Sequence, residues 1–100
     1  MQTANGSTRG QQKFALGKIV ATPGALAAMV KSGDSAQDLI KRHANGDWGE
    51  VCETDQRLND QALVEGARLL SAYKLRDGVT LWIISEADRS ATTFLLPDEY

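Results

Sequence analysis

The Asp77-Gly78 pair, set between two β-favouring runs, constrains the fold of this chain more than any other feature. An Asp-Gly pair in this setting predicts a two-residue type I′ hairpin turn, because glycine takes a positive φ without steric cost and aspartate tolerates one. Counting outward from that turn places Tyr73 opposite Trp82. The stretch from Leu69 to Leu96 is therefore expected to form a hairpin followed by a further strand.

A second turn, at residues 86–89, is predicted to return the chain as a third strand over residues 90–96, with Trp82 opposite Thr93. Side chains alternate across a strand, so this register sorts the sheet into two faces. The face expected to form the core holds Leu70, Ala72, Val79, Leu81, Ile83, Phe94 and Leu96. The other face combines aromatic rings with hydroxyls and holds Ser71, Tyr73, Leu75, Thr80, Trp82, Ile84, Thr93 and Leu95. It is interpreted either as a partner-binding surface or as a second covered face with ordinary core aromatics.

The residues before this stretch predict one more strand and two or three helices. A short apolar run over residues 14–21 is consistent with a strand that joins the sheet. Thr22-Pro23 is a strong helix start, and Gly33 is a typical residue just past a helix end. Further helices are predicted from Asp34 or Ser35 to Asn45-Gly46, and from about Glu53 to Glu65. The fold class predicted is α+β, with these short helices packed on an antiparallel sheet of three to four strands.

Length and composition narrow the range of functions. A chain of 100 residues suits a single domain, predicted over residues 13–100 after a disordered N-terminal extension over residues 1–12. The net charge of −2 disfavours broad electrostatic binding of nucleic acid. No run approaches the ~18 apolar residues of a membrane helix, and the first residues lack the apolar segment of a secretory signal. We therefore expect a cytoplasmic protein without membrane contact.

His43 is the only histidine and so the first candidate for general acid–base chemistry. It ends an apolar stripe, which favours a structural role at the end of a helix. In a catalytic interpretation the chain is a metal-independent ribonuclease that resembles barnase-like toxins in its order of helices before sheet. His43 is then the base, Arg68 or Arg89 supports the phosphate, and Ser90 or Thr92 lines the site; RNA is a partner only in this case.

Other polar residues give weaker indications of chemistry. The acidic residues Asp47, Glu50, Glu53 and Asp55 lack the fixed spacing of a calcium loop and suit helix capping better. Cys52 is the only cysteine and has no CxxC partner, so a buried structural thiol is expected in preference to a nucleophile. Walker A, GxGxxG, GxSxG, HExxH and zinc-ligand spacings are absent from the sequence. We expect no metal and no cofactor.

The run WIISEADRSATTFLLP, with FALGKIVATPGAL and HANGDWGEVCETD before it, resembles a group of small proteins of bacterial plasmids and other mobile elements. The resemblance covers about Phe14 to Tyr100. Some members carry a label that ties them to type I restriction systems. This chain lacks the Asn-Pro-Pro-type motif of a modification subunit, because its only prolines are Pro23 and Pro97. The resemblance therefore implies a mobile-element setting and transfers no functional residues.

The leading hypothesis is a small non-enzymatic interaction or regulatory protein that binds a protein partner or a second copy of itself. The charged loop at residues 86–90 joins two apolar strands, and loops on a rigid sheet often carry function. Together with the mixed face of the sheet it supplies the candidate contacts, which are Tyr73, Trp82, Ile84, Thr93, Leu95, Glu86, Asp88 and Arg89. Tyrosine and tryptophan commonly anchor such interfaces, so a homodimer or a dedicated partner is expected there.

Overall fold

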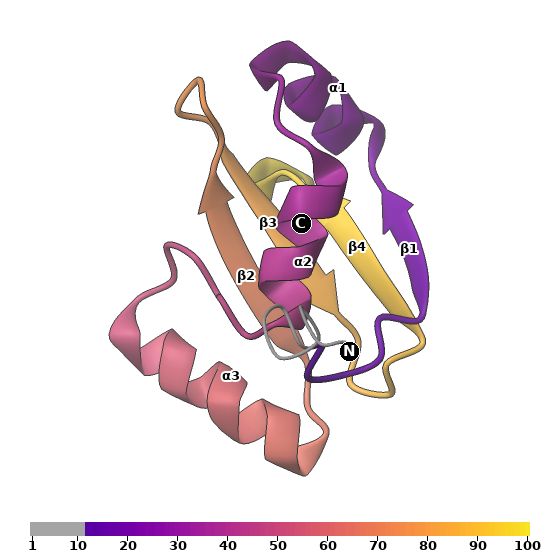
Figure 1. Cartoon of the computed structure of the whole chain (residues 1–100), viewed down its shortest axis with the longest axis vertical. Coiled ribbons are helices and arrows are strands. Elements are labelled where there is room, and N and C mark those ends of the chain that lie inside the picture. The colour runs from indigo at the N-terminus through magenta and orange to yellow at the C-terminus, as the bar shows by residue number, and fades with distance from the viewer. Residues whose placement is uncertain (1–11) are drawn as a thin grey trace, which may run out of the picture.

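The computed structural model describes residues 12–100, and in it helices cover one face of a four-stranded sheet (Figure 1). In chain order the elements are β1 (Lys18–Ala21), α1 (Pro23–Ser32), α2 (Ala36–Ala44), α3 (Glu53–Glu65), β2 (Leu69–Lys74), β3 (Thr80–Ser85), β4 (Ala91–Leu95) and a 3-10 helix, η2 (Pro97–Glu99). The predicted α+β class is confirmed. The extension predicted over residues 1–12 lies, except for Gln12, outside the described residues. None of the helices in residues 12–100 has the length and apolar character needed to cross a membrane.

The strand order is β1-β4-β3-β2, so β1 and β2 are the two edges of the sheet. The run predicted over residues 14–21 supplies β1, the fourth strand. It pairs parallel to β4, whereas β2, β3 and β4 pair antiparallel, so the sheet is mixed. A parallel pair needs a long crossover, and here the helices and the β2–β3 hairpin form that connection. Figure 1 shows α2 lying across the sheet, with α1 at one end and α3 beside β2.

Local sequence explains where the helices begin and end. The Thr22 hydroxyl accepts a hydrogen bond from the Ala25 N–H at 3.1 Å, which caps α1. Gly33 ends α1 with a φ of 79°. The apolar side chains of α1 are only partly buried, because Ala25 and Met29 face the core while Val30 is 82% exposed.

The turn between β2 and β3 is one residue longer than predicted. Gly78 donates its N–H to the Leu75 carbonyl at 2.9 Å, and Leu75 donates to the Val79 carbonyl at 2.8 Å. Gly78 has the predicted positive φ, at 91°, but Asp77 does not, so the type I′ assignment is wrong. The loop has three residues and ends in a glycine in the left-handed region, which is another common hairpin. Tyr73 consequently lies opposite Leu81 instead of Trp82.

This one-residue slip moves β2 side chains to the opposite face from the one predicted. Tyr73 is fully buried under the helices, and its hydroxyl donates to the Asp47 carbonyl at 2.5 Å. Leu70 and Ala72, predicted in the core, lie on the Trp82 face instead. The β3–β4 register also differs, with Trp82 opposite Leu95, but a shift of two residues preserves the faces. The main core comprises Ala25, Met29, Leu39, Tyr73, Leu75, Leu81, Ile83 and Phe94.

Candidate functional site

His43, near the end of α2, is the centre of a buried chain of hydrogen bonds between the helices and the sheet. Its Nδ1 atom lies 2.6 Å from Ser71 Oγ, and its Nε2 atom lies 2.9 Å from Ser85 Oγ. Ser85 Oγ lies 2.7 Å from Thr92 Oγ1, and Thr92 donates to the Leu16 carbonyl at 2.8 Å. All four polar side chains are 0% exposed. One residue from each of β2, β3 and β4 therefore contributes a hydroxyl to the chain.

The donor at each step follows from hydrogen counting. Thr92 gives its single hydroxyl hydrogen to the Leu16 carbonyl, so it accepts from Ser85. Ser85 has then used its hydrogen and accepts from the Nε2–H of His43, which leaves Nδ1 to accept from Ser71. A neutral imidazole protonated at Nε2 satisfies every link. A second proton at Nδ1 would leave the Ser71 hydroxyl hydrogen without this acceptor.

Burial, together with the positive charge of nearby Arg89, lowers the pKa of His43 to about 4. The imidazole is neutral at pH 7. A catalytic base must come within hydrogen-bonding distance of its substrate, and in this structure His43 and Thr92 are closed off inside the core. The arrangement supports the structural role of His43.

Arg89 holds the loop after β3 against α3. Its guanidinium donates to the carbonyl oxygens of Ala67 at 2.6 Å, Glu86 at 2.9 Å and Ala62 at 3.2 Å, and it lies 5.5 Å from the centre of the Phe14 ring. The Ala62 carbonyl belongs to the last turn of α3, where a cation is favourable. The guanidinium is therefore occupied by backbone carbonyls.

The residues of the ribonuclease hypothesis do not form one surface. Arg68 lies on the face of the sheet opposite the helices, where it donates to the Tyr100 hydroxyl at 2.5 Å. Ser90 is exposed in the loop, whereas His43 and Thr92 lie inside the core. The structure thus brings His43, Thr92 and Arg89 near one another, but it buries His43 and Thr92 and places the Arg89 guanidinium on backbone carbonyls.

The predicted interaction face keeps Trp82, Ile84, Thr93 and Leu95 but loses Tyr73. Ile84 and Leu95 are only 6% and 7% exposed. The Tyr100 ring packs edge-on against Trp82 at 5.7 Å and lies 5.8 Å from the Arg68 guanidinium. On this face Ile84 lies between Arg68 and Trp82. Because the Tyr100 ring contacts both of these residues, it extends across the face at Ile84. Tyr100 therefore occupies part of the predicted interface.

The charged residues around the turns also have local partners. Asp88 accepts from the Ser90 N–H at 3.0 Å, and Glu86 lies 3.9 Å from Arg68. Asp47 pairs with Arg42 at 2.7 Å, and this hydrogen bond lowers the pKa of the aspartate. Within residues 12–100 no three histidine, cysteine or acidic side chains are grouped as metal ligands. The prediction of a buried Cys52 thiol is wrong, because Cys52 is exposed at the start of α3.

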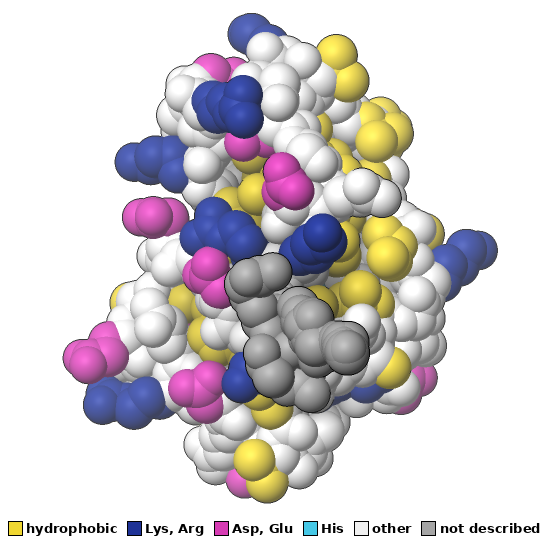
Figure 2. Space-filling model, viewed as in Figure 1, with side chains coloured by type: hydrophobic (Ala, Val, Ile, Leu, Met, Phe, Trp, Pro, Cys, Tyr) yellow, Lys and Arg dark blue, Asp and Glu magenta, His cyan; other side chains and the backbone are white. Residues whose placement is uncertain are grey.

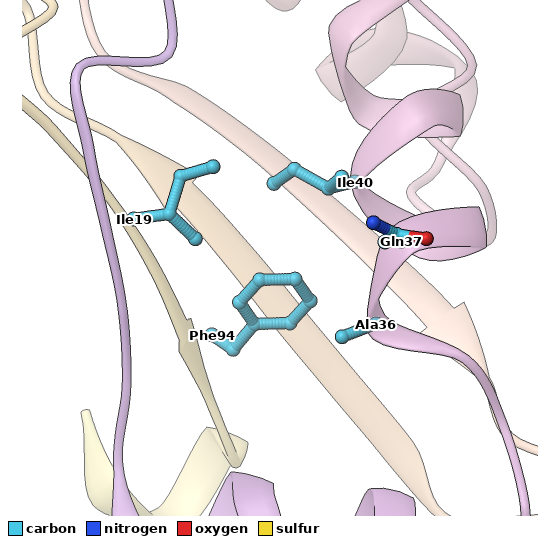
Figure 3. A pocket seen from close by; sticks show the side chains of 5 residues that line it. All are labelled: Ile19, Ala36, Gln37, Ile40 and Phe94. Atoms are coloured by element: carbon cyan, nitrogen blue, oxygen red, sulfur yellow. The ribbon is translucent and has the colours of Figure 1, made fainter.

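An apolar groove between α2 and β1 was not predicted from the sequence. It has a volume of about 120 Å³ and is lined by Ile19 from β1, Phe94 from β4, and Ala36, Gln37 and Ile40 from α2 (Figure 3). Ile19 is 51% exposed. Figure 2 shows hydrophobic side chains gathered on this side of the molecule, over α1 and between α2 and β1.

The edge of β1 beside this groove has backbone groups with no partner in the described part of the chain. Lys18 donates its N–H to the carbonyl of Ser90, the residue before β4, and Thr22 donates to the Phe94 carbonyl in β4, at 3.0 Å each. Alternate residues of a strand point their backbone groups to opposite sides, so those of Ile19 and Ala21 point away from the sheet. An open row of donors and acceptors thus runs along the groove.

The opposite edge, at β2, is closed at Leu70 and Ala72. The Asn59 side chain pairs with both backbone groups of Leu70, at 2.7 and 3.1 Å. Ala72 donates to the Trp48 carbonyl and accepts from the Glu50 N–H. Among residues 12–100, the outward backbone groups of Leu70 and Ala72 in β2 are therefore paired by side chain or backbone, while those of Ile19 and Ala21 in β1 are not.

Comparison of the chain with protein-family models, with curated proteins and with solved structures gives no match. The resemblance to plasmid proteins therefore stays a prediction. The one sequence signal for the β1 site is the apolar run at residues 14–21, which indicates a strand but not its place in the sheet.

Proposed function

We propose that this chain is a small non-enzymatic protein-interaction module that accepts an extended segment of a protein along β1. The observation that carries this proposal is the contrast between the two edges of the sheet. The β2 edge is capped by Asn59 and by residues 48–50, whereas the backbone groups of Ile19 and Ala21 face outward. Proteins normally protect such an edge, because it pairs readily with another strand.

The groove supplies the second element of such a binding site. In strand addition, main-chain hydrogen bonds provide affinity and side-chain pockets provide specificity. The volume of about 120 Å³ approaches the ~150 Å³ of an engineered cavity that holds benzene, so it suits one aromatic or branched side chain. The amide of Gln37 adds a polar group to this apolar lining. The ligand class is therefore an extended peptide with an apolar side chain directed between α2 and β1.

The fully buried His43 supports a non-enzymatic role, since the strongest candidate base is committed to Ser71 and Ser85. The resemblance of residues 14–100 to small plasmid proteins suggests that the partner belongs to a mobile element. In this proposal the β1 edge replaces the Trp82 face as the principal contact, because Tyr100 packs on Trp82.

Selection of ligands from a displayed random-peptide library tests the proposal. Bound peptides should shift the amide resonances of Ile19, Ala21 and Ile40 in the protein's NMR spectrum. Ile19→Pro removes an outward N–H that the fold itself does not use, and edge positions tolerate proline. It should weaken binding by about tenfold or more.

Two variants control for loss of the fold and of apolar surface. Ile19→Val keeps the backbone donor and should bind within about threefold of the wild type. Val64→Ser removes an exposed apolar side chain from α3 and should leave binding unchanged. Binders that map to Trp82 and Tyr100, or that tolerate Ile19→Pro, would contradict the proposed site.

A further inference from the structure

We infer that the segment received by β1 is β1 of a second copy, paired antiparallel about a twofold axis that passes beside Val20. This inference rests on the proposed function and names its partner. The two sheets then join edge to edge. Because the β2 edges are capped at Leu70 and Ala72, the assembly stops at two chains.

The outward backbone groups restrict the register of this pairing. Antiparallel strands exchange hydrogen bonds only between residues that point their backbone groups at one another. In β1 these are Ile19 and Ala21, because Lys18 and Thr22 donate toward the β4 side, to Ser90 and Phe94. Ile19 opposite the partner's Ala21 gives two such pairs by symmetry, each exchanging two bonds. Val20 then lies opposite the partner's Val20.

Two neighbouring registers also bring outward backbone groups face to face, but in each of them one residue cannot form the strand pairing. Centring the axis on Ile19 brings Gly17 opposite the partner's Ala21, but Gly17 has a φ of 66° and is not extended. Centring it on Ala21 brings Ile19 opposite the partner's Pro23, which has no N–H and begins α1. A register shifted by a single residue would place the outward-pointing backbone groups of one strand opposite residues of the partner whose groups point inward. Only the register centred on Val20 uses extended residues with donors.

Side chains on the face opposite the helices favour the same register. Val20 is 37% exposed and would pack against its own copy, at the position where facing Cα atoms are closest. Lys18 lies opposite the partner's Thr22 and not opposite another lysine. The Thr22 hydroxyl donates to the Glu99 carboxylate at 2.6 Å, so the Lys18 ammonium would meet a negative charge. The twofold axis generates the same contact between Lys18 and Glu99 a second time, with the two chains exchanged.

Cysteine crosslinking tests the position of the axis. In a Cys52→Ser background, Val20→Cys should form a disulfide-linked dimer under mild oxidation. Facing Cα atoms at such a position lie about 4.5 Å apart, within the roughly 4.4–6.8 Å that a disulfide spans. Val79→Cys is the matched control, because Val79 is 39% exposed but lies at the β2–β3 hairpin. It should remain reduced or crosslink only at the background level.

Sedimentation of uncrosslinked protein tests the charge pairing. The wild type should have the mass of two chains, and Lys18→Glu should raise the dimer dissociation constant by about tenfold or more. Lys74→Glu reverses an exposed charge on the opposite edge of the sheet and should leave the constant unchanged. A dimer that crosslinks through Val79→Cys, or that ignores Lys18→Glu, would overturn the inference. A monomer that still binds peptides in an Ile19-dependent way would overturn it while leaving the proposed function intact.

Discussion

The Nε2 atom of His43 lies 2.9 Å from the Oγ atom of Ser85, and this bond is one link in a chain that crosses three strands of the sheet. Buried polar groups weaken a core unless each has a partner. Here each hydroxyl and each ring nitrogen has one when the imidazole is neutral. The same contact therefore ties the helix layer to the sheet and makes the fold sensitive to protons.

Acid should destabilise the protein through His43 in a defined pH range. Folding lowers the pKa of this group from 6.5 to about 4, so the unfolded chain binds the proton first. The stabilisation is complete above pH 6.5 and is lost as pH falls toward 4, by at most about 3 kcal/mol. Urea unfolding between pH 7 and 4 measures the loss. NMR titration of the single imidazole should give a midpoint far below 6.5, and an ordinary midpoint would contradict the buried chain.

Removing Ser85 should cost more stability than removing Ser71. Ser85→Ala leaves the His43 N–H without an acceptor and also cuts the link to Thr92, whereas Ser71→Ala leaves only an acceptor unpaired. An unsatisfied buried group costs about 1–3 kcal/mol. Urea unfolding of both variants checks the order, and the exposed Ser90→Ala should change stability by less than about 0.5 kcal/mol. Equal, negligible effects of Ser85→Ala and Ser90→Ala would rule out the assigned hydrogen bonds.

Two glycines with positive φ should respond differently to alanine. A side chain at Gly78 meets nothing within 4 Å, so Gly78→Ala should cost only the backbone strain of roughly 1–2 kcal/mol. At Gly49 a new Cβ would collide with the Ala72 carbonyl oxygen, which accepts from the Glu50 N–H. Gly49→Ala should therefore be clearly the more destabilising in thermal unfolding. Equal costs would mean that the 48–50 segment does not pair with β2.

Truncation of Phe94 tests the core. Phe94 is 2% exposed in the main cluster, opposite Ile83, so Phe94→Ala should cost about 3–5 kcal/mol. Val64→Ala, at a position that is 87% exposed, provides the comparison and should be nearly neutral. An unchanged melting temperature for Phe94→Ala would refute the placement of Phe94 in the core.

Sequence patterns that involve only a few neighbouring residues predict the ends of the helices correctly. Thr22-Pro23 begins α1, Gly33 follows it, and the helix predicted over residues 53–65 is α3. Capping depends on neighbours in the chain, so the sequence contains the information needed. The hairpin register was not determined in this way. Asp77-Gly78 suits both a two-residue and a three-residue loop, and the second places Tyr73 in the core beside Leu81.

By itself the sequence determined the α+β class, the order of the elements and the positive φ at Gly78. Only the tertiary structure decided which residues form the candidate site. Asn59 pairs with the backbone of Leu70, eleven residues away, at the β2 edge. The backbone groups of Ile19 stay open at the other edge, because β1 pairs only with β4. His43 likewise finds Ser85 forty-two residues away. These contacts join residues distant in sequence, and local propensity carries no information about which distant segments will meet.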